Sequence, residues 1–375
     1  MILNDNSIIF HIDVNSAYLS WSALRELQNG SKLDLRTIPS IVGGDQETRH
    51  GIVVAKSIPA KAFGIQTAET VASAFQKCPT LVMVPPDHTY YREMSQKLMH
   101  HLRSICDEIE QVSIDECYMS FEPIRSQFPT PEAAAAYIKD SVYDTFGFTV
   151  NVGISDRKVL AKMASDFKKP NLVHTLYVSE IQQKLWPLPI SSLHMCGKSS
   201  AKLLQKMGIR TIGDLAHTDK AVVESWLKSH GGMLWNYANG IDEGQVVKER
   251  PKAKGVGNST TLANNAETEE EAYAVLKELA TAEEAEIYQC ACQLFDELWD
   301  GEPIRLLGIR TTKLQDEEEP TQISLFDLAR YQEQEKKEEL RREKEAQKQK
   351  KLASLDDAIA KIKKRYGADA IHKGV

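Results

Sequence analysis

Three carboxylates are the residues of this sequence best placed to do chemistry. Asp13 ends a short apolar segment, and Asp115 and Glu116 lie between two strand-like segments. If these strand ends meet at one edge of a sheet, the carboxylates raise one another's pKa unless cations neutralise them. Divalent metals with oxygen ligands are the usual cations, and two of them can clamp a phosphoryl displacement. The alternative is structural, with an aspartate that caps the next helix and an Asp-Glu pair at an ordinary turn.

Basic side chains are concentrated in residues 153–170, which hold five basic and two acidic groups. A solvated helix face is the interpretation that this segment favours on its own. The alternative is contact with phosphates, for which the candidates are Arg157, Lys158, Lys162, Lys168 and Lys169.

A Gly-rich turn, GKSSAKLL at residues 197–204, resembles a helix-hairpin-helix. In that motif, backbone N–H groups at the turn bind a DNA phosphate without reading sequence. Gly197, Lys198 and Lys202 are the candidates for this contact. A simple pair of antiparallel helices is an equally good interpretation.

QISLF, residues 322–326, has the pattern of a short docking peptide. Leu325 and Phe326 would fill a pocket on a partner, and Gln322 would fix the register. The alternative is a small apolar patch that folds back on its own domain.

The elements that must position these residues follow the order βαββαβ, once the Gly- and Pro-punctuated residues 30–75 are set aside. This order predicts a ferredoxin-like layer of helices on an antiparallel sheet, and an α+β fold. It places Asp13 at a strand end and Asp115 with Glu116 at a hairpin tip. The predicted strands are 7–14, two within 109–122, and 148–155 with period-2 alternation, and the predicted helices are 16–28, 88–107, 131–145 and 157–168.

The second half of the chain has a different character. Residues 171–245 predict short helices, 246–258 a polar linker, and 259–315 strand-like ends around one unbroken helical pattern over 267–299. The charge-rich residues 327–351 and a small amphipathic helix over 354–366 follow.

Composition excludes several classes of protein. No apolar segment of the 375 residues approaches the ~18 that a membrane span needs, and the first residues lack the features of a secretory signal. Six scattered cysteines without a CxxC pair favour the reducing cytoplasm over a disulfide framework or a zinc site. The net charge of −7 does not support a nucleic-acid partner, but residues 264–302 alone hold twelve acidic groups and one lysine. A basic surface elsewhere is therefore compatible with the total.

Three motifs together resemble the Y family of translesion DNA polymerases, in its bacterial polymerase IV and UmuC-like branches. They are HIDVNSAYLSW (11–21), VSIDECYMS (112–120) and VNVGISDRKVLAKMASDFKKPN (150–171). The resemblance implies that Asp13, Asp115, Glu116 and the Val14 carbonyl bind two Mg²⁺ ions. It further implies that Tyr18 excludes the 2′-hydroxyl of ribonucleotides, and that Lys169 binds the triphosphate.

The sequence departs from the family pattern at four positions. Lys61 stands where the polymerase IV branch usually has Arg. A lysine can still neutralise a phosphate of the triphosphate, but it lacks the bidentate hydrogen bonding of a guanidinium group. Ile58 replaces a triphosphate-binding Tyr, and no such role is transferred to it. Asn15 replaces an Asp of many relatives and is not counted as a ligand. Met195 replaces the first Gly of the hairpin turn.

The resemblance implies a right-hand architecture with a helical thumb. The implied parts are palm (1–30 and 76–170), fingers (31–75), thumb (171–245), linker (246–258), little finger (259–315), and a tail (316–375) in which QISLF binds the sliding clamp, the β subunit. The little finger departs most from the family, because its two central strands, roughly 30 residues, are missing from the pattern.

The prediction is a cytoplasmic, monomeric DNA-directed DNA polymerase that copies damaged primer–template DNA from deoxynucleoside triphosphates, with low fidelity and no proofreading. The alternative is a catalytically weak or inactive, clamp-tethered DNA-binding accessory protein, because the little finger is truncated. A third hypothesis, a helix-hairpin-helix glycosylase or nuclease, needs a catalytic Lys or Asp after the hairpin. Lys202 and Asp214 are available for it, but it leaves the palm unexplained.

Overall fold

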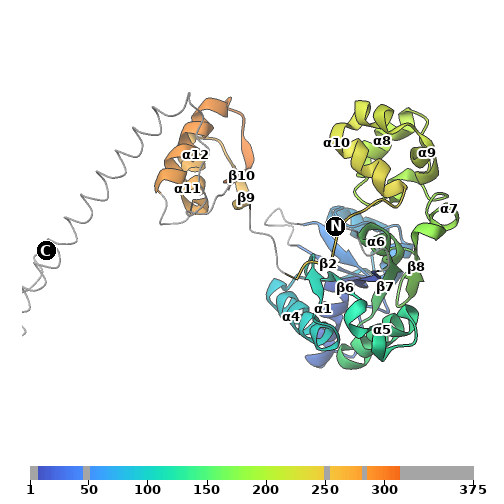
Figure 1. Ribbon diagram of the computed structural model, residues 1–375. Helices are drawn as coiled ribbons and strands as arrows, with labels where there is room; N and C mark the ends of the chain where they lie inside the picture. The colour runs from blue at the N-terminus through green and yellow to red at the C-terminus, as the bar shows by residue number, and fades with distance from the viewer. Residues whose placement is uncertain (1–6, 45–50, 249–253, 281–284, 313–375) are drawn as a thin grey trace, which may run out of the picture. The chain divides into compact units, whose positions relative to one another are not determined.

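A central five-stranded sheet organises the first half of the computed structural model, which describes residues 7–44, 51–248, 254–280 and 285–312 (Figure 1). The strand order is β5-β6-β1-β7-β8, and every neighbouring pair is antiparallel except β7 with β8. The strands are β1 (Ile9–Val14), β5 (Ile109–Gln111), β6 (Glu116–Ser120), β7 (Val150–Ser155) and β8 (Val173–Thr175). β5, β6, β1 and β7 have the ferredoxin-like order that the sequence predicts, and β8 adds an unpredicted edge strand.

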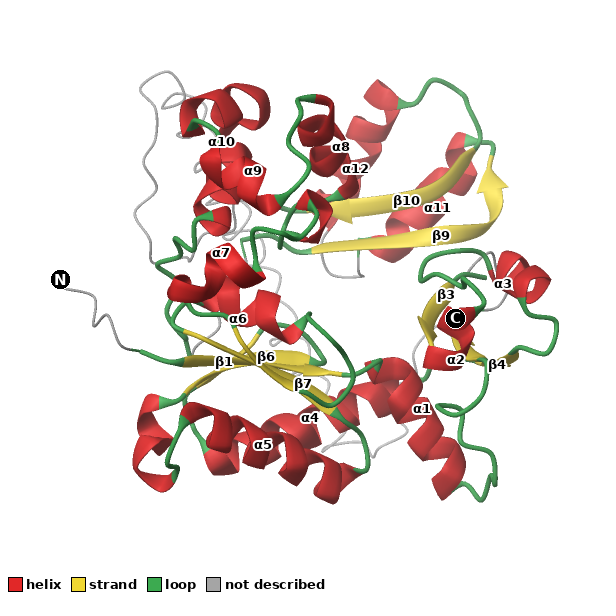
Figure 2. Cartoon of the chain, turned by 90° about the vertical axis from the view of Figure 1, so that its right-hand side faces the viewer, coloured by secondary structure: helices red, strands yellow, loops and turns green. Residues whose placement is uncertain are grey.

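Helices cover both faces of this sheet. Figure 2 shows α4 (His88–Ile105) and α5 (Pro131–Phe146) on one face and α6 (Lys158–Ser165) on the other. All six residues of β1 and all six of β7 are consequently buried. The polar residues that alternate with apolar ones in this predicted strand are therefore buried as well from residue 150 onward, because a strand covered on both sides has no solvent face.

Local sequence sets the helix ends. The side chain of Asp87 accepts a hydrogen bond from the Tyr90 amide and caps α4, and Thr130 caps α5 at the Ala133 amide. Pro131 takes the first position of α5, and Gly147, with φ of 76°, ends it. One side of α4 faces the core, where Tyr91, Met94, Leu98 and Leu102 are buried.

The segment between α1 (Ala17–Gln28) and α4 forms a second, three-stranded sheet of order β3-β2-β4. Its elements are β2 (Ser40–Gly43), β3 (Val53–Lys56), α2 (Ile58–Ala62), α3 (Val71–Lys77) and β4 (Val82–Val84). β4 pairs in parallel with β2, so residues 82–84 lie in this small sheet, beyond the boundary at 75 predicted for the fingers.

Short helices follow β8, as predicted, and form their own apolar core with one face of α6. Leu160 and Met163 of α6 pack in this core with Leu204 and Leu215. The remaining elements before residue 240 are the 3₁₀ helices η1 (Glu122–Gln127), η2 (Val178–Glu180) and η3 (Ile190–Ser192), and the α-helices α7 (Ile181–Lys184), α8 (Lys198–Lys206), α9 (Ile212–His217) and α10 (Lys220–Ala238).

The start of the predicted linker is docked onto the central sheet. The Val247 amide donates to a Glu110 carboxylate oxygen at 2.8 Å, and Lys248 pairs with Asp107 at 2.8 Å. Residues 246–248 are therefore held by β5 and its flanking turn.

The described residues 254–280 and 285–312 contain a two-stranded antiparallel sheet, β9 (Gly257–Ala266) and β10 (Ile304–Arg310), with two helices. The helices are α11 (Glu269–Leu279) and α12 (Ala285–Leu298), so the prediction of one helix over 267–299 is wrong. The rings of Tyr273 and Phe295 lie 5.9 Å apart, whereas one straight helix would separate these residues by about 33 Å. The two helices therefore fold back on each other.

No helix in the parts of the chain just described is long and apolar enough to cross a membrane. The tail with QISLF and the predicted helix over 354–366 lie outside the described residues.

Gly153 of β7 is expected to be intolerant of any side chain, because α6 crosses it closely. A Cβ atom here would lie closer than 3.0 Å to the Ala161 carbonyl oxygen and the Ser165 amide. Gly153→Ala should therefore destabilise the fold by about 3 kcal/mol. The thermal unfolding midpoint measures this, with Gly197→Ala as the control, since nothing lies within 4 Å of a Cβ atom there. Equal midpoints for the two variants would contradict this account of the β7–α6 contact.

Candidate active site

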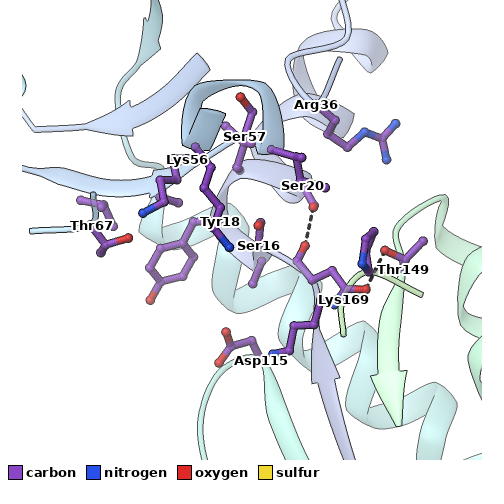
Figure 3. Close-up of a pocket in the computed structure, with 18 residues that line it drawn as sticks. Ser16, Tyr18, Ser20, Arg36, Lys56, Ser57, Thr67, Asp115, Thr149 and Lys169 are labelled. Carbon is purple, nitrogen blue, oxygen red and sulfur yellow. Dashed lines mark hydrogen bonds between the residues drawn. The ribbon is translucent and has the colours of Figure 1, made fainter. Parts of the chain in front are cut away.

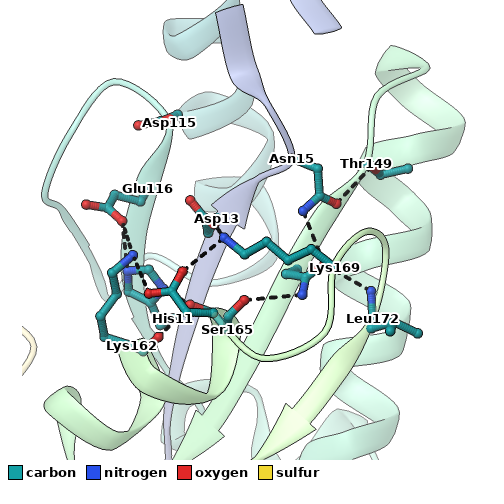
Figure 4. Close-up of polar contacts among 12 residues, drawn as sticks. His11, Asp13, Asn15, Asp115, Glu116, Thr149, Lys162, Ser165, Lys169 and Leu172 are labelled. Atoms are coloured by element: carbon teal, nitrogen blue, oxygen red, sulfur yellow. Dashed lines mark hydrogen bonds and ion pairs between the residues drawn. The ribbon is translucent and has the colours of Figure 1, made fainter. Parts of the chain in front are cut away.

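Asp13 and Glu116 lie directly opposite each other on neighbouring strands of the central sheet, because β1 and β6 pair in the register Asp13↔Glu116. Each carboxylate holds an ammonium group (Figure 4). Lys169 forms an ion pair with Asp13, and the Lys162 Nζ lies 2.7 Å from Glu116 Oε2. Lys158 of the same segment pairs with Glu110, so three of its four lysines are paired with carboxylates. The interpretation as a solvated helix face is therefore wrong.

Glu116 is strongly held in its ionised form. The hydrogen bond from His11 and the hydrogen bond and charge of Lys162 lower the pKa of Glu116 to about 2 against the opposing effect of burial. Burial on its own would lower the pKa of Lys162, but Glu116, Asp13 and Asp166 outweigh it, and the pKa is raised. Both members of the pair therefore stay charged near neutral pH.

Asp13 is more deeply buried, with 8% of its surface exposed. Burial raises the pKa of Asp13, and the adjacent ammonium of Lys169 opposes this rise. A buried carboxylate of this kind requires a nearby positive charge to remain ionised.

Asp115 lies on the turn before β6. The Ser113 hydroxyl donates to Asp115 Oδ1 at 2.6 Å, and the Val14 amide donates to the Asp115 carbonyl oxygen at 3.0 Å. These bonds hold the turn against the end of β1. Within the described residues, however, no three His, Cys, Asp or Glu side chains are close enough together to hold a metal ion.

The donor chemistry at this sheet edge nevertheless fits a hard divalent cation. Asp13, Asp115 and Glu116 offer carboxylate oxygens, the donors that Mg²⁺ prefers. The structure already accommodates two positive charges here, the ammonium groups of Lys162 and Lys169. The predicted metal ligands therefore meet at one edge, with Asp115 apart from the directly facing pair.

A cavity of about 640 Å³ opens beside Asp115 (Figure 3). Four of the predicted site residues line it together: Tyr18, Lys61, Asp115 and Lys169. They come from α1, α2, the turn before β6 and the segment after α6, so only the fold brings them together. Residues that the sequence analysis did not single out also line the cavity, among them Arg36, Lys56, Ser57 and Thr67.

Lys56 is the clearest of these missed residues. Burial and the charge of Lys61 lower the pKa of Lys56, so two ammonium groups lie near each other at one wall of the cavity. The only signal in the sequence is its position five residues before Lys61, within the segment VVAKSIPAKAFGIQTA.

Tyr18 lies in the first turn of α1, and its ring stacks on Tyr91 with 4.6 Å between centroids. Burial raises the pKa of Tyr18, and the carboxylate of Asp115 adds to the rise. Tyr18 is thus a fixed aromatic wall close to Asp115.

Asn15 acts as a structural anchor. Its side-chain oxygen accepts from the Thr149 hydroxyl and the Asn171 amide, both at 2.9 Å, and its amide nitrogen donates to Asn151 at 3.2 Å. Both polar atoms of the amide are thus engaged within the protein, and the interpretation that Asn15 is not a metal ligand stays a prediction.

The structure differs from the predicted helix-hairpin-helix in the first element of the motif. Before the turn stands the three-residue 3₁₀ helix η3, and α8 begins after Gly197. Lys198 and Lys202 lie one turn apart on α8, and both are exposed. Asp214 completes the capping box of α9 and accepts from the Arg210 and Thr211 amides, which explains this residue without a catalytic role.

Comparison with known proteins gives consistent matches. Residues 12–166 match the model of the impB/mucB/samB family, and residues 279–325 match that family's C-terminal domain. DNA polymerase IV of Clostridium acetobutylicum is 37% identical over 99% of this chain and 98% of its own length. DNA polymerase IV 1 of Bacillus subtilis is 32% identical over 98% of this chain and 92% of its own length.

Among solved structures, a Y-family DNA polymerase chimera, Dbh-Dpo4(243-245)-Dbh, has a TM-score of 0.70. It is 21% identical and covers 82% of this chain and 99% of its own, so this match bears on the fold alone.

The alignment with the Clostridium relative also bears on the size of the C-terminal domain. It is 408 positions long, against 375 residues in this chain, so at least 33 positions are gaps in this chain. Two missing central strands would account for a gap of this size, and their absence stays a prediction.

Proposed function

Because this chain belongs to the Y family of translesion DNA polymerases, among the DNA polymerases IV, we propose that it extends primers across damaged templates with the cavity beside Asp115 as its nucleotide site. A single observation carries the assignment of the site: Tyr18, Lys61, Asp115 and Lys169 line one cavity at the sheet edge where Asp13 and Glu116 face each other.

Asp13, Asp115, Glu116 and the Val14 carbonyl would hold two Mg²⁺ ions. Bound there, the ions would offset negative charge on the α-phosphate and favour ionisation of the primer 3′-hydroxyl.

The remaining residues would bind and orient the nucleotide. Lys61 and Lys169 would neutralise the triphosphate, and Lys56 would add a third positive charge at the same wall. Lys169 can serve both partners because its side chain is 35% exposed and lines the cavity while it pairs with Asp13. Tyr18 would lie against C2′ of the sugar, and Gly197, Lys198 and Lys202 would contact a DNA phosphate.

Primer extension by the purified full-length chain tests this proposal. We expect template-directed addition of deoxynucleotides with Mg²⁺, opposite both intact and abasic templates. Binding of primer–template without any extension would instead support the alternative, a clamp-tethered accessory protein. That alternative rests on the shortened C-terminal domain, and the proposed carboxylate set opposes it.

We propose palm, fingers, thumb and little finger with the boundaries given above, save that β4 extends the fingers to residue 84. We further propose action as a cytoplasmic monomer, and binding of the sliding clamp through QISLF.

The shortened little finger is expected to weaken DNA binding. Residues 264–302 are strongly acidic, and two absent strands would remove basic groups that face phosphates. Grafting two central strands between α11 and α12, to complete the βαββαβ order of the little finger, should raise affinity about tenfold and steepen the salt dependence by about 0.9 per added phosphate contact. Measuring the affinity for primer–template DNA at several salt concentrations gives both effects. A graft with its Lys and Arg changed to Gln is the control, and equal affinity and slope for the native and grafted chains would contradict the prediction.

The clamp peptide yields a separate prediction. Replacing Leu325 and Phe326 with Ala should weaken binding to a bacterial sliding clamp about a hundredfold or more, because both apolar anchors are lost. Synthesis without the clamp should stay unchanged. Leu340→Ala, in the same tail but outside QISLF, is the matched control. Undiminished clamp affinity in the double variant would exclude the peptide.

A further inference from the structure

His11 is a buried residue of the central sheet that the proposed mechanism does not use. It is 1% exposed and precedes Asp13 by two residues on β1, so both side chains lie on the same face of the sheet. His11 contacts Ser165 of α6, so this is the face that α6 covers. In the register of β1 and β6, His11 lies opposite Tyr118, two residues from Glu116 on the same face. The fold therefore brings a histidine beside the predicted metal ligand.

Both ring nitrogens of His11 are engaged (Figure 4). Nε2 lies 3.4 Å from Glu116 Oε2, and Nδ1 lies 2.8 Å from the Ser165 hydroxyl. The edge of the Tyr118 ring packs against the imidazole, with 4.8 Å between centroids. Contacts on three sides leave the ring a single orientation.

Glu116 is held from two directions at one oxygen. Lys162 Nζ approaches Oε2 at 2.7 Å from α6, and His11 approaches the same atom from β1. The Ser165 hydroxyl oxygen, the other partner of His11, lies 2.8 Å from both Nδ1 and the Lys162 carbonyl oxygen, so the contacts close a ring through α6. Since a carboxylate oxygen only accepts, the imidazole proton that faces it lies on Nε2.

We propose that His11 is a positioning residue for the polymerase reaction: it fixes the Glu116 carboxylate, with Ser165 fixing the ring in turn, so that Glu116 presents a constant orientation to a divalent cation. This inference rests on the proposed function, in which Glu116 is a metal ligand. Outer partners that orient a metal ligand typically change metal affinity or activity by about 10–100-fold when they are removed.

Two substitutions separate positioning from simple packing. The amide nitrogen of Gln reaches the place of Nε2 and can still donate to Glu116. The amide of Asn reaches only the place of Nδ1, so it keeps the Ser165 contact and loses Glu116. The test measures Mn²⁺ binding to the full-length chain by electron paramagnetic resonance, together with kcat and KM for nucleotide incorporation with Mg²⁺.

We expect His11→Asn to weaken Mn²⁺ binding and lower kcat by about 10–100-fold, with the KM for nucleotide changed less than twofold. His11→Gln should restore both to within about threefold of the native chain. The matched control is His101→Asn, because His101 also contacts a serine, Ser141, at 3.1 Å but has no place in the site. It should bind Mn²⁺ like the native chain.

Native Mn²⁺ binding in His11→Asn, with the unfolding midpoint retained, would overturn the proposal. If neither His11 variant folds, Ser165→Ala decides, since it removes only a hydroxyl and should weaken Mn²⁺ binding about 3–10-fold. Unchanged binding in that variant would also overturn it. Glu116→Gln distinguishes failure of the His11 inference from failure of the proposed function. If this variant changes neither Mn²⁺ binding nor incorporation, the proposed function itself fails.

Discussion

Replacing Glu116 with Gln is expected to reduce nucleotide incorporation about a thousandfold or more. The substitution keeps the shape of the side chain but removes a charge that Lys162 and His11 hold in its ionised form. Loss of a metal at the sheet edge removes several kcal/mol of charge stabilisation at the phosphate, and each 1.36 kcal/mol is about tenfold in rate. Asp115→Asn should act similarly. Single-turnover incorporation with rapid quenching measures the effect.

The matched control is Glu110→Gln. Glu110 lies on β5 of the same sheet and forms the same kind of ion pair, with Lys158 Nζ at 2.7 Å, but it does not line the cavity. This variant should incorporate nucleotides at the native rate. Near-native rates for Glu116→Gln and Asp115→Asn would disprove the metal assignment.

The central sheet and its carboxylates were predictable because they depend on short-range patterns. Apolar segments that end in Asp13, and a hairpin that carries Asp115 and Glu116, determine which residues reach one edge once the βαββαβ order is recognised. The ion pairs of Lys162 and Lys169 were not predictable. They depend on where α6 crosses β1, a tertiary contact that local periodicity does not encode.

The break between α11 and α12 was not predictable from the sequence either, because it also depends on a tertiary contact. Residues 278–286 contain neither Gly nor Pro, so helix propensity gives no reason to end a helix there. The packing of Tyr273 on Phe295 is a tertiary interaction, and it overrides a helical pattern that continues through residue 299. The edge strand β8 was missed for a related reason, because three residues are too few to show a period.

Selection against ribonucleotides gives the second large expected effect. Tyr18 is held in place by its stack on Tyr91, and the turn that precedes it is fixed by the Ser20 hydroxyl, which donates to the Asn15 carbonyl oxygen at 2.7 Å. At the proposed nucleotide site, the ring would therefore not move aside for an added 2′-hydroxyl. Overpacking of this kind costs about 1–3 kcal/mol, which corresponds to about 10–100-fold in rate.

Tyr18→Ala should consequently raise the ratio of ribonucleotide to deoxyribonucleotide incorporation by about 10–100-fold. Tyr18→Phe keeps the ring and its stack, so its ratio should match that of the native chain. Competition between the two nucleotides opposite the same template base measures the ratio directly, independent of any loss in overall rate. An Ala variant that still incorporates deoxyribonucleotides but shows the native ratio would mean that Tyr18 only packs against Tyr91, and that sugar selection lies elsewhere in the cavity.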